Sequence, residues 1–280
     1  MHSLVLNDNL ALVTGRDGYF LVNRNDLYVG KAIEKYGEYN AQEGEFLKSL
    51  TCSGDTVVEV GANIGSHTVG LAKRVGASGK VYAFEPQRAC YALLQAQLAL
   101  NELGNVHAFD QALGAQAGTL WLPHINYGEP GNFGGIALVS SGTERHEKVI
   151  VDTLDRFFED QPVTLLKIDV EGMERQVLEG GEHLLERTKP LLYVENDRVE
   201  ESPALIDFLL ARGYRLYWHM PPLYNPDNHF RVAQNIYGNV ASFNMLCVHD
   251  TRDCDAAAGL REIKWSGEPH PLANQRHPGP

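Results

Sequence analysis

The chain has 280 residues, of which 44% are hydrophobic and 21% are charged, a composition typical of a globular protein. That length accommodates one α/β domain with additional elements. The formal net charge of −12 disfavours binding to nucleic acid. No apolar run approaches the roughly 18 residues of a membrane span, and the first ten residues lack the features of a signal peptide, so we expect a cytoplasmic protein that contacts no membrane.

The first fifty residues predict a small N-terminal cap. Residues 10–29 alternate apolar and polar positions around two glycine-containing turns, which predicts a short antiparallel element. A helix is expected over 42–50. The sequence leaves open whether this cap, residues 1–50, packs on its own chain or on a neighbouring copy.

Residues 51–250 alternate strand and helix patterns, which indicates βαβ units around a mostly parallel sheet. The expected strands are 56–60, 80–86, 105–113, 163–170, 190–197, 214–220 and 242–248. Helices are expected over 66–75, with Ser66 as N-cap, and over 88–101, 172–187 and 202–212. The last two strands have no helix between them, so they predict an antiparallel pair at one edge.

The predicted fold is therefore a Rossmann-like α/β domain. It has a mostly parallel seven-stranded sheet with an antiparallel C-terminal edge strand, and helices on both faces. Residues 251–280 are polar, contain prolines and show no periodicity, so we expect a poorly ordered tail there.

The turn after the first strand of this domain predicts a ligand site. Gly61, Asn63 and Gly65 lie between the strand 56–60 and the next helix. Glycine lets the backbone approach a ligand closely, and the free N–H groups of a helix N-terminus attract polar or anionic atoms. The spacing differs from the dinucleotide fingerprint G-x-G-x-x-G, and a tight connection without a ligand is the alternative.

Two acidic residues favour a nucleoside ligand at this turn. Glu59 lies inside an otherwise apolar strand, where a buried carboxylate needs hydrogen-bond partners. The ammonium group of a cofactor is one such partner. Glu85 ends the next strand, where an acidic side chain accepts hydrogen bonds from both hydroxyls of a ribose; the alternative is a solvated charge.

Four segments together resemble the FkbM family of S-adenosylmethionine-dependent methyltransferases, from about Tyr28 to Val248. They are E-V-G-A-N-I-G-x-H-T, V-Y-A-F-E-P, L-L-K-I-D-V-E-G-M-E and N-M-L-C. The resemblance implies a class I methyltransferase fold with S-adenosylmethionine as cofactor. It also implies that Glu59, Gly61, Asn63 and Gly65 line the methionine end of the cofactor, that Glu85 holds its ribose, and that its adenine lies near Asp110 and Gln111.

Acidic residues at two further strand ends predict the place of methyl transfer, because ligands of open α/β sheets bind beyond the carboxyl ends of the strands. Asp169 is expected next to the cofactor, and either Asp169 or Glu171 removes the acceptor's proton or positions its hydroxyl. For Glu171 the alternative is a favourable charge at the start of the following helix. His219 is a third candidate base.

A divalent cation is a further hypothesis for these strand ends. Asp169, Glu195 and Asn196 occupy positions similar to the magnesium ligands of catechol-type O-methyltransferases. Oxygen ligands of this kind suit Mg²⁺.

Two irregular segments, 126–138 and 219–239, are expected to surround a small-molecule acceptor. His219, Tyr224 and Asn228 are the candidate acceptor contacts, with ordinary loop packing as the alternative for each. The leading functional hypothesis is O-methylation of a hydroxyl on a sugar or a natural-product scaffold. N-methylation, a nicotinamide-dependent oxidoreductase and a non-catalytic cofactor-binding protein are the alternatives.

Overall fold

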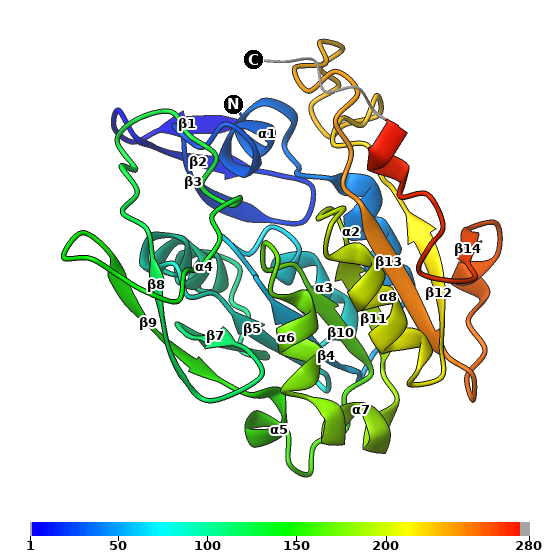
Figure 1. Cartoon of the computed structure of the whole chain (residues 1–280). Helices are drawn as coiled ribbons and strands as arrows, with labels where there is room; N and C mark the ends of the chain where they lie inside the picture. Colours follow the sequence, from blue (N-terminus) through cyan, green and yellow to red (C-terminus); the bar gives the residue numbers. More distant parts are fainter. Residues whose placement is uncertain (1, 275–280) are drawn as a thin grey trace.

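The computed structural model describes residues 2–274, and its centre is an eight-stranded sheet in the order β14-β12-β13-β11-β10-β4-β5-β6 (Figure 1). The strands are β4 (Thr56–Val60), β5 (Lys80–Phe84), β6 (Val106–Phe109), β10 (Leu165–Ile168), β11 (Leu191–Glu195), β12 (Tyr214–His219), β13 (Asn244–His249) and β14 (Arg261–Ile263). The order reverses between β4 and β10, as in Rossmann folds, where ligands bind at this reversal.

The edge of the sheet differs in two respects from the sequence-based prediction. The sheet has eight strands rather than seven, and β13 is not an edge strand, because it lies between β11 and β12 and pairs antiparallel with both. The outer edge is β14, which is antiparallel to β12. The hairpin-like pairing of β12 with β13 was predictable, whereas the insertion of β13 beside β11 depends on tertiary contacts.

Helices cover both faces of the sheet, as predicted. Side chains of α2 (Ala41–Ser49) and α3 (Thr68–Val75) pack in one core cluster against one face, and α4 (Arg88–Leu100) packs on the same side against β5. The other face carries α5 (Leu154–Phe157), α6 (Glu174–Glu179), α7 (Glu182–Thr188) and α8 (Ser202–Leu210). The strands are consequently apolar on both sides.

The predicted helix over 172–187 is two helices, α6 and α7, because the chain passes very close to its neighbours at Gly180 and Gly181. A Cβ on Gly180 would lie 2.0 Å from the carbonyl oxygen of Gly114, and one on Gly181 would lie 2.7 Å from Leu154 Cδ1. Ser66 is not an N-cap either. Helix α3 begins at Thr68 after His67, without a side-chain capping bond.

The N-terminal unit consists of β1 (Ser3–Val5), β2 (Leu10–Thr14), β3 (Tyr19–Asn23), α1 (Val29–Tyr36) and α2. Its three strands form an antiparallel sheet. Two side-chain amides hold this sheet against α4. Gln97, within α4, bonds the backbone N–H and C=O of Leu21, and Asn101, directly after α4, bonds the same two groups of Tyr19. The unit therefore lies on its own chain, next to the end of β4 and β5 where the site is found (Figure 1).

A second small sheet has the strand order β7-β9-β8. Its strands are β7 (Ala112–Leu113), β8 (Gly118–Leu122) and β9 (Glu147–Asp152). The long loop between β8 and β9 reaches the N-terminal unit, where Gly131 pairs with Asn25 and Leu27 (Figure 1). This loop thus bridges the small sheet and the N-terminal unit.

Residues 251–274 differ from the predicted poorly ordered tail. They contain the 3-10 turns η1 (Asp255–Ala257) and η2 (Pro271–Asn274) on either side of strand β14, and His270 is buried. The polar composition of this segment does not indicate that β14 pairs with β12. The remainder of the predicted tail, 275–280, lies outside the described residues. Within residues 2–274, no helix is long and apolar enough to cross a membrane.

Candidate functional site

The glycine turn after β4 adopts backbone conformations that favour glycine. Gly61 and Gly65 have φ values of 85° and 84°, and Asn63 has a φ of 51°. A Cβ on Gly61 would lie 1.7 Å from the carbonyl oxygen of Asp169. The turn and the end of β10 therefore approach each other so closely that no other residue fits at position 61.

Glu85 is fixed at the end of β5 by the same turn. Its Oε2 accepts a hydrogen bond from the backbone N–H of Asn63 and its Oε1 accepts one from Gln87, both at 2.8 Å. The side chain is 6% exposed, and burial raises its pKa to about 7 against these hydrogen bonds. Each oxygen keeps a second acceptor position, so the oriented carboxylate fits a ribose diol.

A buried lysine that the sequence analysis missed lies beside Glu59. Lys167 pairs in register with Glu59 across β10 and β4, and its Nζ lies 4.0 Å from Glu59 Oε1 and 3.2 Å from Asp169 Oδ2. Burial alone would lower the pKa of Lys167, but these carboxylates and Glu43 raise it above its usual value. Thr68 donates a further hydrogen bond of 2.6 Å to Glu59. The partners of Glu59 are thus within the protein.

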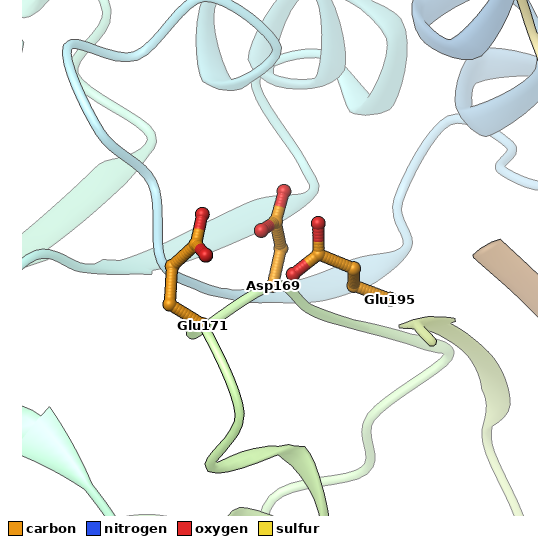
Figure 2. A group of neighbouring side chains, drawn as sticks. All are labelled: Asp169, Glu171 and Glu195. Atoms are coloured by element: carbon orange, nitrogen blue, oxygen red, sulfur yellow. The ribbon is translucent and has the colours of Figure 1, made fainter. Parts of the chain in front are cut away.

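Three carboxylates converge beyond the ends of β10 and β11. Figure 2 shows Asp169 between Glu171 and Glu195, and one oxygen of each lies within 4.8 Å of the others. Glu171 has a φ of 58° and pairs with Arg198. Such strained conformations cluster at functional sites.

Two members of this trio, Glu171 and Glu195, have raised pKa values. Burial, with Asp169, raises the pKa of Glu171 to about 8, although Arg198 opposes the shift. Burial raises the pKa of Glu195 well above its usual range, and its Oε2 finds no hydrogen-bond partner among residues 2–274. The predicted helix-start role of Glu171 falls to Glu174 instead, which accepts hydrogen bonds from the backbone N–H groups of Val170 and Gly172.

The predicted magnesium ligand set is wrong at Asn196. This side chain is buried, and its amide donates to Met245 Sδ at 3.2 Å. Its backbone pairs with Phe243 and contacts His270. Asn196 follows Glu195, the last residue of β11, and its amide is held at Met245, so the structure does not bring it together with Asp169 and Glu195. The acidic cluster that remains is also paired with Lys167 and Arg198.

A cavity of about 140 Å³ joins these groups. Its lining combines the glycine turn, the strand-end acids and side chains from the N-terminal unit. The residues are Tyr28, Val29, Tyr39, Glu43, Glu59, Gly61, Ala62, Asn63, Ser66, His67, Glu85, Asn132, Gly134, Gly135, Lys167, Asp169, Glu171, Glu195 and Ser242. The sequence analysis missed Tyr28, Tyr39, Glu43, His67, Lys167 and Ser242. For Lys167 the signal was present, since a charge inside an apolar strand needs a partner.

A second cavity of about 60 Å³ adjoins the first beyond Glu85. It is lined mainly by apolar side chains from three segments, including Leu113, Ile136 and Met173. Of the two residues predicted near adenine, Gln111 lines this cavity and Asp110 is exposed outside it. An apolar slot next to an oriented carboxylate suits a nucleoside.

Part of the loop between β8 and β9, residues 126–138, covers both cavities. Tyr127 donates a hydrogen bond to Gln87 Oε1, and Gln87 Nε2 donates one to the carbonyl of Phe133. Gly134 and Ile136 come next in the chain and line the second cavity. Gln87, at the start of α4, therefore fixes the cover relative to Glu85.

The three candidate acceptor contacts of the segment 219–239 lie outside the lining of the main cavity. His219 Nδ1 is 2.7 Å from the Tyr193 hydroxyl, its ring stacks on Phe46, and burial lowers its pKa to about 4. Tyr224 donates its hydroxyl hydrogen to carbonyls of its own loop. Asn228 is fully buried and bonds three times within the loop, twice to Val232. All three side chains thus make their contacts within the protein.

The fold and the site together define a Rossmann-like protein that can hold a nucleoside cofactor at a topological reversal, with acidic groups beside it. Residues 59–216 match the family model of the methyltransferase FkbM domain. This match covers more than half of the chain, so the chain belongs to the FkbM methyltransferase family, and the resemblance inferred from the four segments is confirmed.

Similar proteins include two methyltransferases of known source. The chain is 32% identical to methyltransferase sdnD of Sordaria araneosa, over 44% of this chain and 59% of that protein. It is also 32% identical to methyltransferase 1 of Beauveria bassiana, over 44% of this chain and 57% of that protein. The chain thus spans less than two thirds of the length of these relatives. A crystal structure of a methyltransferase FkbM from Methylobacillus flagellatus superposes with a TM-score of 0.48 at 17% identity, covering 70% of this chain and 44% of that one.

Proposed function

We propose that this chain uses S-adenosylmethionine to methylate a hydroxyl of a small molecule, such as a sugar or a natural-product scaffold. One observation carries the proposal. A single cavity runs from the diol-binding carboxylate of Glu85, past the glycine turn, to the carboxylate of Asp169. A cofactor with a ribose and a charged amino-acid end fits the first part, and the remaining space is bordered by hydrogen-bond acceptors.

The described residues fit each portion of this cofactor. The apolar slot beyond Glu85 suits adenine, Glu85 suits the ribose hydroxyls, and Gly61 and Asn63 line the space for the methionine portion. When bound, the cofactor supplies an electrophilic methyl group on a sulfonium. Carboxyl oxygens of Asp169 and Glu171 line this part of the cavity, and such polar oxygens favour the positive charge.

The residues around the transfer point orient the acceptor and exclude water. Lys167 Nζ donates a hydrogen bond to Asp169 Oδ2 at 3.2 Å and fixes the position of this side chain. Asp169 therefore accepts a hydrogen bond from the acceptor and aligns its oxygen for in-line displacement. The cover over 126–138 shields the reacting atoms from bulk water.

A hydroxyl acceptor fits this environment because its proton must leave, and several carboxylates are available to receive it. An amine is the second candidate, since the acidic lining would also attract a cationic amine.

Isothermal titration calorimetry with S-adenosylmethionine, S-adenosylhomocysteine and NAD⁺ tests the cofactor. We expect the first two to bind and NAD⁺ to show no heat of binding, whereas binding of NAD⁺ alone would overturn the proposal. A panel of hydroxylated small molecules and matched amines, assayed by S-adenosylhomocysteine formation, then tests the acceptor. Turnover confined to the amines would transfer the proposal to N-methylation.

A further inference from the structure

Part of the cavity lining comes from outside the segment that matches the family model. Tyr28, Tyr39 and Glu43 belong to the N-terminal unit, and Ser242 precedes β13. The matched residues 59–216 contain the glycine turn, Glu85 and Asp169. If the glycine turn and Glu85 hold the cofactor, the lining residues of the N-terminal unit border the space left for the acceptor.

Glu43 is the ionisable group of this contribution, and its carboxylate is built into place. The side chain is 3% exposed. Its Oε2 accepts hydrogen bonds from Asn40 Nδ2 at 2.5 Å and from Asn244 Nδ2 at 3.3 Å. Its Oε1 lies 3.6 Å from His67 Nε2 and accepts no hydrogen bond from any residue within 2–274. One oxygen is thus anchored by two amides, while the other remains available in a group that lines the cavity.

The backbone at Asn40 supports a dedicated arrangement. Asn40 precedes α2 with a φ of 41°, in the left-handed region, and makes no side-chain capping bond to its helix. Its amide instead donates to Glu43 and to Ser242 Oγ. An asparagine at this position would ordinarily cap the helix, so the chain gives up a capping bond and accepts a strained backbone to orient one carboxylate.

The charges around Glu43 set the range in which it can exchange a proton. Burial raises its pKa to about 7, with Lys167 lowering it and Asp169 and Glu59 raising it. His67 stays neutral, because burial and Lys167 lower its pKa to about 3. The remaining titratable groups with charge interactions at Glu43 are Tyr39 and Tyr193, both with pKa values raised well above their usual range by burial.

We propose that Glu43 is the catalytic base that takes the proton of the acceptor hydroxyl, and that the N-terminal unit thereby carries the acceptor chemistry. This inference rests on the proposed methyl transfer. As the acceptor oxygen forms its bond to the methyl carbon, the carbon–sulfur bond breaks and its electron pair stays on sulfur. The hydroxyl proton moves to Glu43 Oε1 and is later released to solvent.

The same arrangement restricts the class of acceptor. An acceptor group in this cavity lies among the carboxyl groups of Glu43, Asp169, Glu171 and Glu195, and each of them that gives up its proton repels a phosphate or carboxylate near the reacting hydroxyl. We therefore infer a neutral or cationic acceptor whose hydroxyl points toward α2.

The first test needs no acceptor and locates Glu43 relative to the cofactor. Glu43→Cys is made in a background with Cys52 and Cys254 replaced by serine, since Cys90 and Cys247 are buried. Methyl methanethiosulfonate should label the introduced thiol in the presence of saturating S-adenosylhomocysteine, and the labelled protein should still bind S-adenosylhomocysteine. Protection of the thiol by S-adenosylhomocysteine would place position 43 under the cofactor and overturn the proposal, as would a thiol that resists labelling in the folded apoprotein.

The second test measures turnover with Glu43→Gln, which keeps the size of the side chain and an acceptor oxygen for the two amides. We expect S-adenosylhomocysteine affinity within about threefold of the wild type, kcat lower by about 10²–10⁴-fold, and loss of the acidic limb of the kcat profile near pH 7. The matched control is Glu38→Gln, because Glu38 is a buried carboxylate of the same unit that bonds Arg16, Asn225 and His229 outside the main cavity. A Glu43→Gln enzyme with near-normal kcat and an unchanged acidic limb would overturn the role of Glu43. If the wild-type protein itself does not bind S-adenosylhomocysteine, the proposed function is overturned instead.

Discussion

The two ends of the main cavity are built in different ways. The end assigned to the cofactor comes from strand ends that are neighbours in the sheet, β4, β5 and β10, so the hydrogen-bonded ladder fixes it. The end assigned to the acceptor comes from α1 and α2, the loop over 126–138 and the segment before β13. These segments are far apart in sequence and are held together mostly by side-chain amides.

The sheet therefore fixes the geometry of the cofactor end, whereas the geometry of the acceptor end can change with the peripheral segments. If the two ends are separable, a change in the N-terminal unit alters the lining at Tyr28, Tyr39 or Glu43 without moving the glycine turn. Function resides in sites carried by a scaffold, and specificity resides in its peripheral segments. The following changes test whether the two ends are in fact separable.

The largest effect is expected from Lys167→Met, which removes a buried cation that interacts with both ends. It leaves Glu59 and Asp169 close together with no lysine between them. Breaking a buried ion pair from one side costs about 3–5 kcal/mol, so the free energy of unfolding in urea should fall by that amount. Lys80→Met, at an exposed position on β5, is the control. A decrease in the free energy of unfolding of less than about 1 kcal/mol would show that Glu59 and Asp169 do not depend on the charge of Lys167.

A smaller effect, confined to the cofactor end, is expected from Gly61→Ala. The new Cβ would meet the Asp169 carbonyl at 1.7 Å, and φ at this position is 85°. Strain of this kind costs about 1–3 kcal/mol, and the displaced turn should weaken S-adenosylhomocysteine binding by about 100-fold in calorimetry. Gly104→Ala, where nothing lies within 4 Å of the added Cβ, should leave both quantities unchanged. Wild-type affinity in Gly61→Ala would show that the cofactor lies elsewhere.

The cofactor end is largely predictable from the sequence because its signals are local. A charged residue in an apolar strand, a glycine turn and an acidic strand end point to Glu59, Gly61 and Glu85 without any knowledge of tertiary contacts. The same reasoning applies to Lys167, which stands between apolar residues of β10, although the sequence analysis does not single it out.

The acceptor end could not be predicted in the same way. Nothing in the composition of 219–239 indicates that Tyr224 and Asn228 bond within their own loop. Likewise, no local pattern places Glu43 opposite Asn244, about 200 residues away. The prediction for Asn196 is wrong because its amide bonds Met245 of the neighbouring strand β13, a contact that the local sequence does not indicate.

A moderate effect that depends on pH is expected from Glu85→Gln. The pKa of Glu85 is raised to about 7 by burial in the folded protein, against 4.5 for the ordinary carboxyl. The folded state therefore holds a proton that the unfolded state loses, and the free energy of unfolding falls as pH rises from about 4.5 to 7. Glu85→Gln should make this decline shallower in urea titrations, because Glu43 and Glu171 still titrate with raised pKa values. It should also weaken S-adenosylhomocysteine binding by about tenfold, since hydrogen bonds to charged groups contribute about 1.5–3 kcal/mol. A decline that persists unchanged would assign the titration to another group.

The smallest effect is expected from Tyr224→Phe, which tests whether the loop over 219–239 is part of the acceptor end or only its support. The hydroxyl of Tyr224 bonds the carbonyls of Val232 and Ala233, and its ring contacts that of Tyr36. Removing the hydroxyl should lower the free energy of unfolding by about 1 kcal/mol and leave kcat and the acceptor KM unchanged. A rise in acceptor KM at unchanged stability would bring Tyr224 back as a substrate contact. That result would also extend the acceptor end beyond the described cavity, because the hydroxyl would have to leave its loop partners to reach the acceptor.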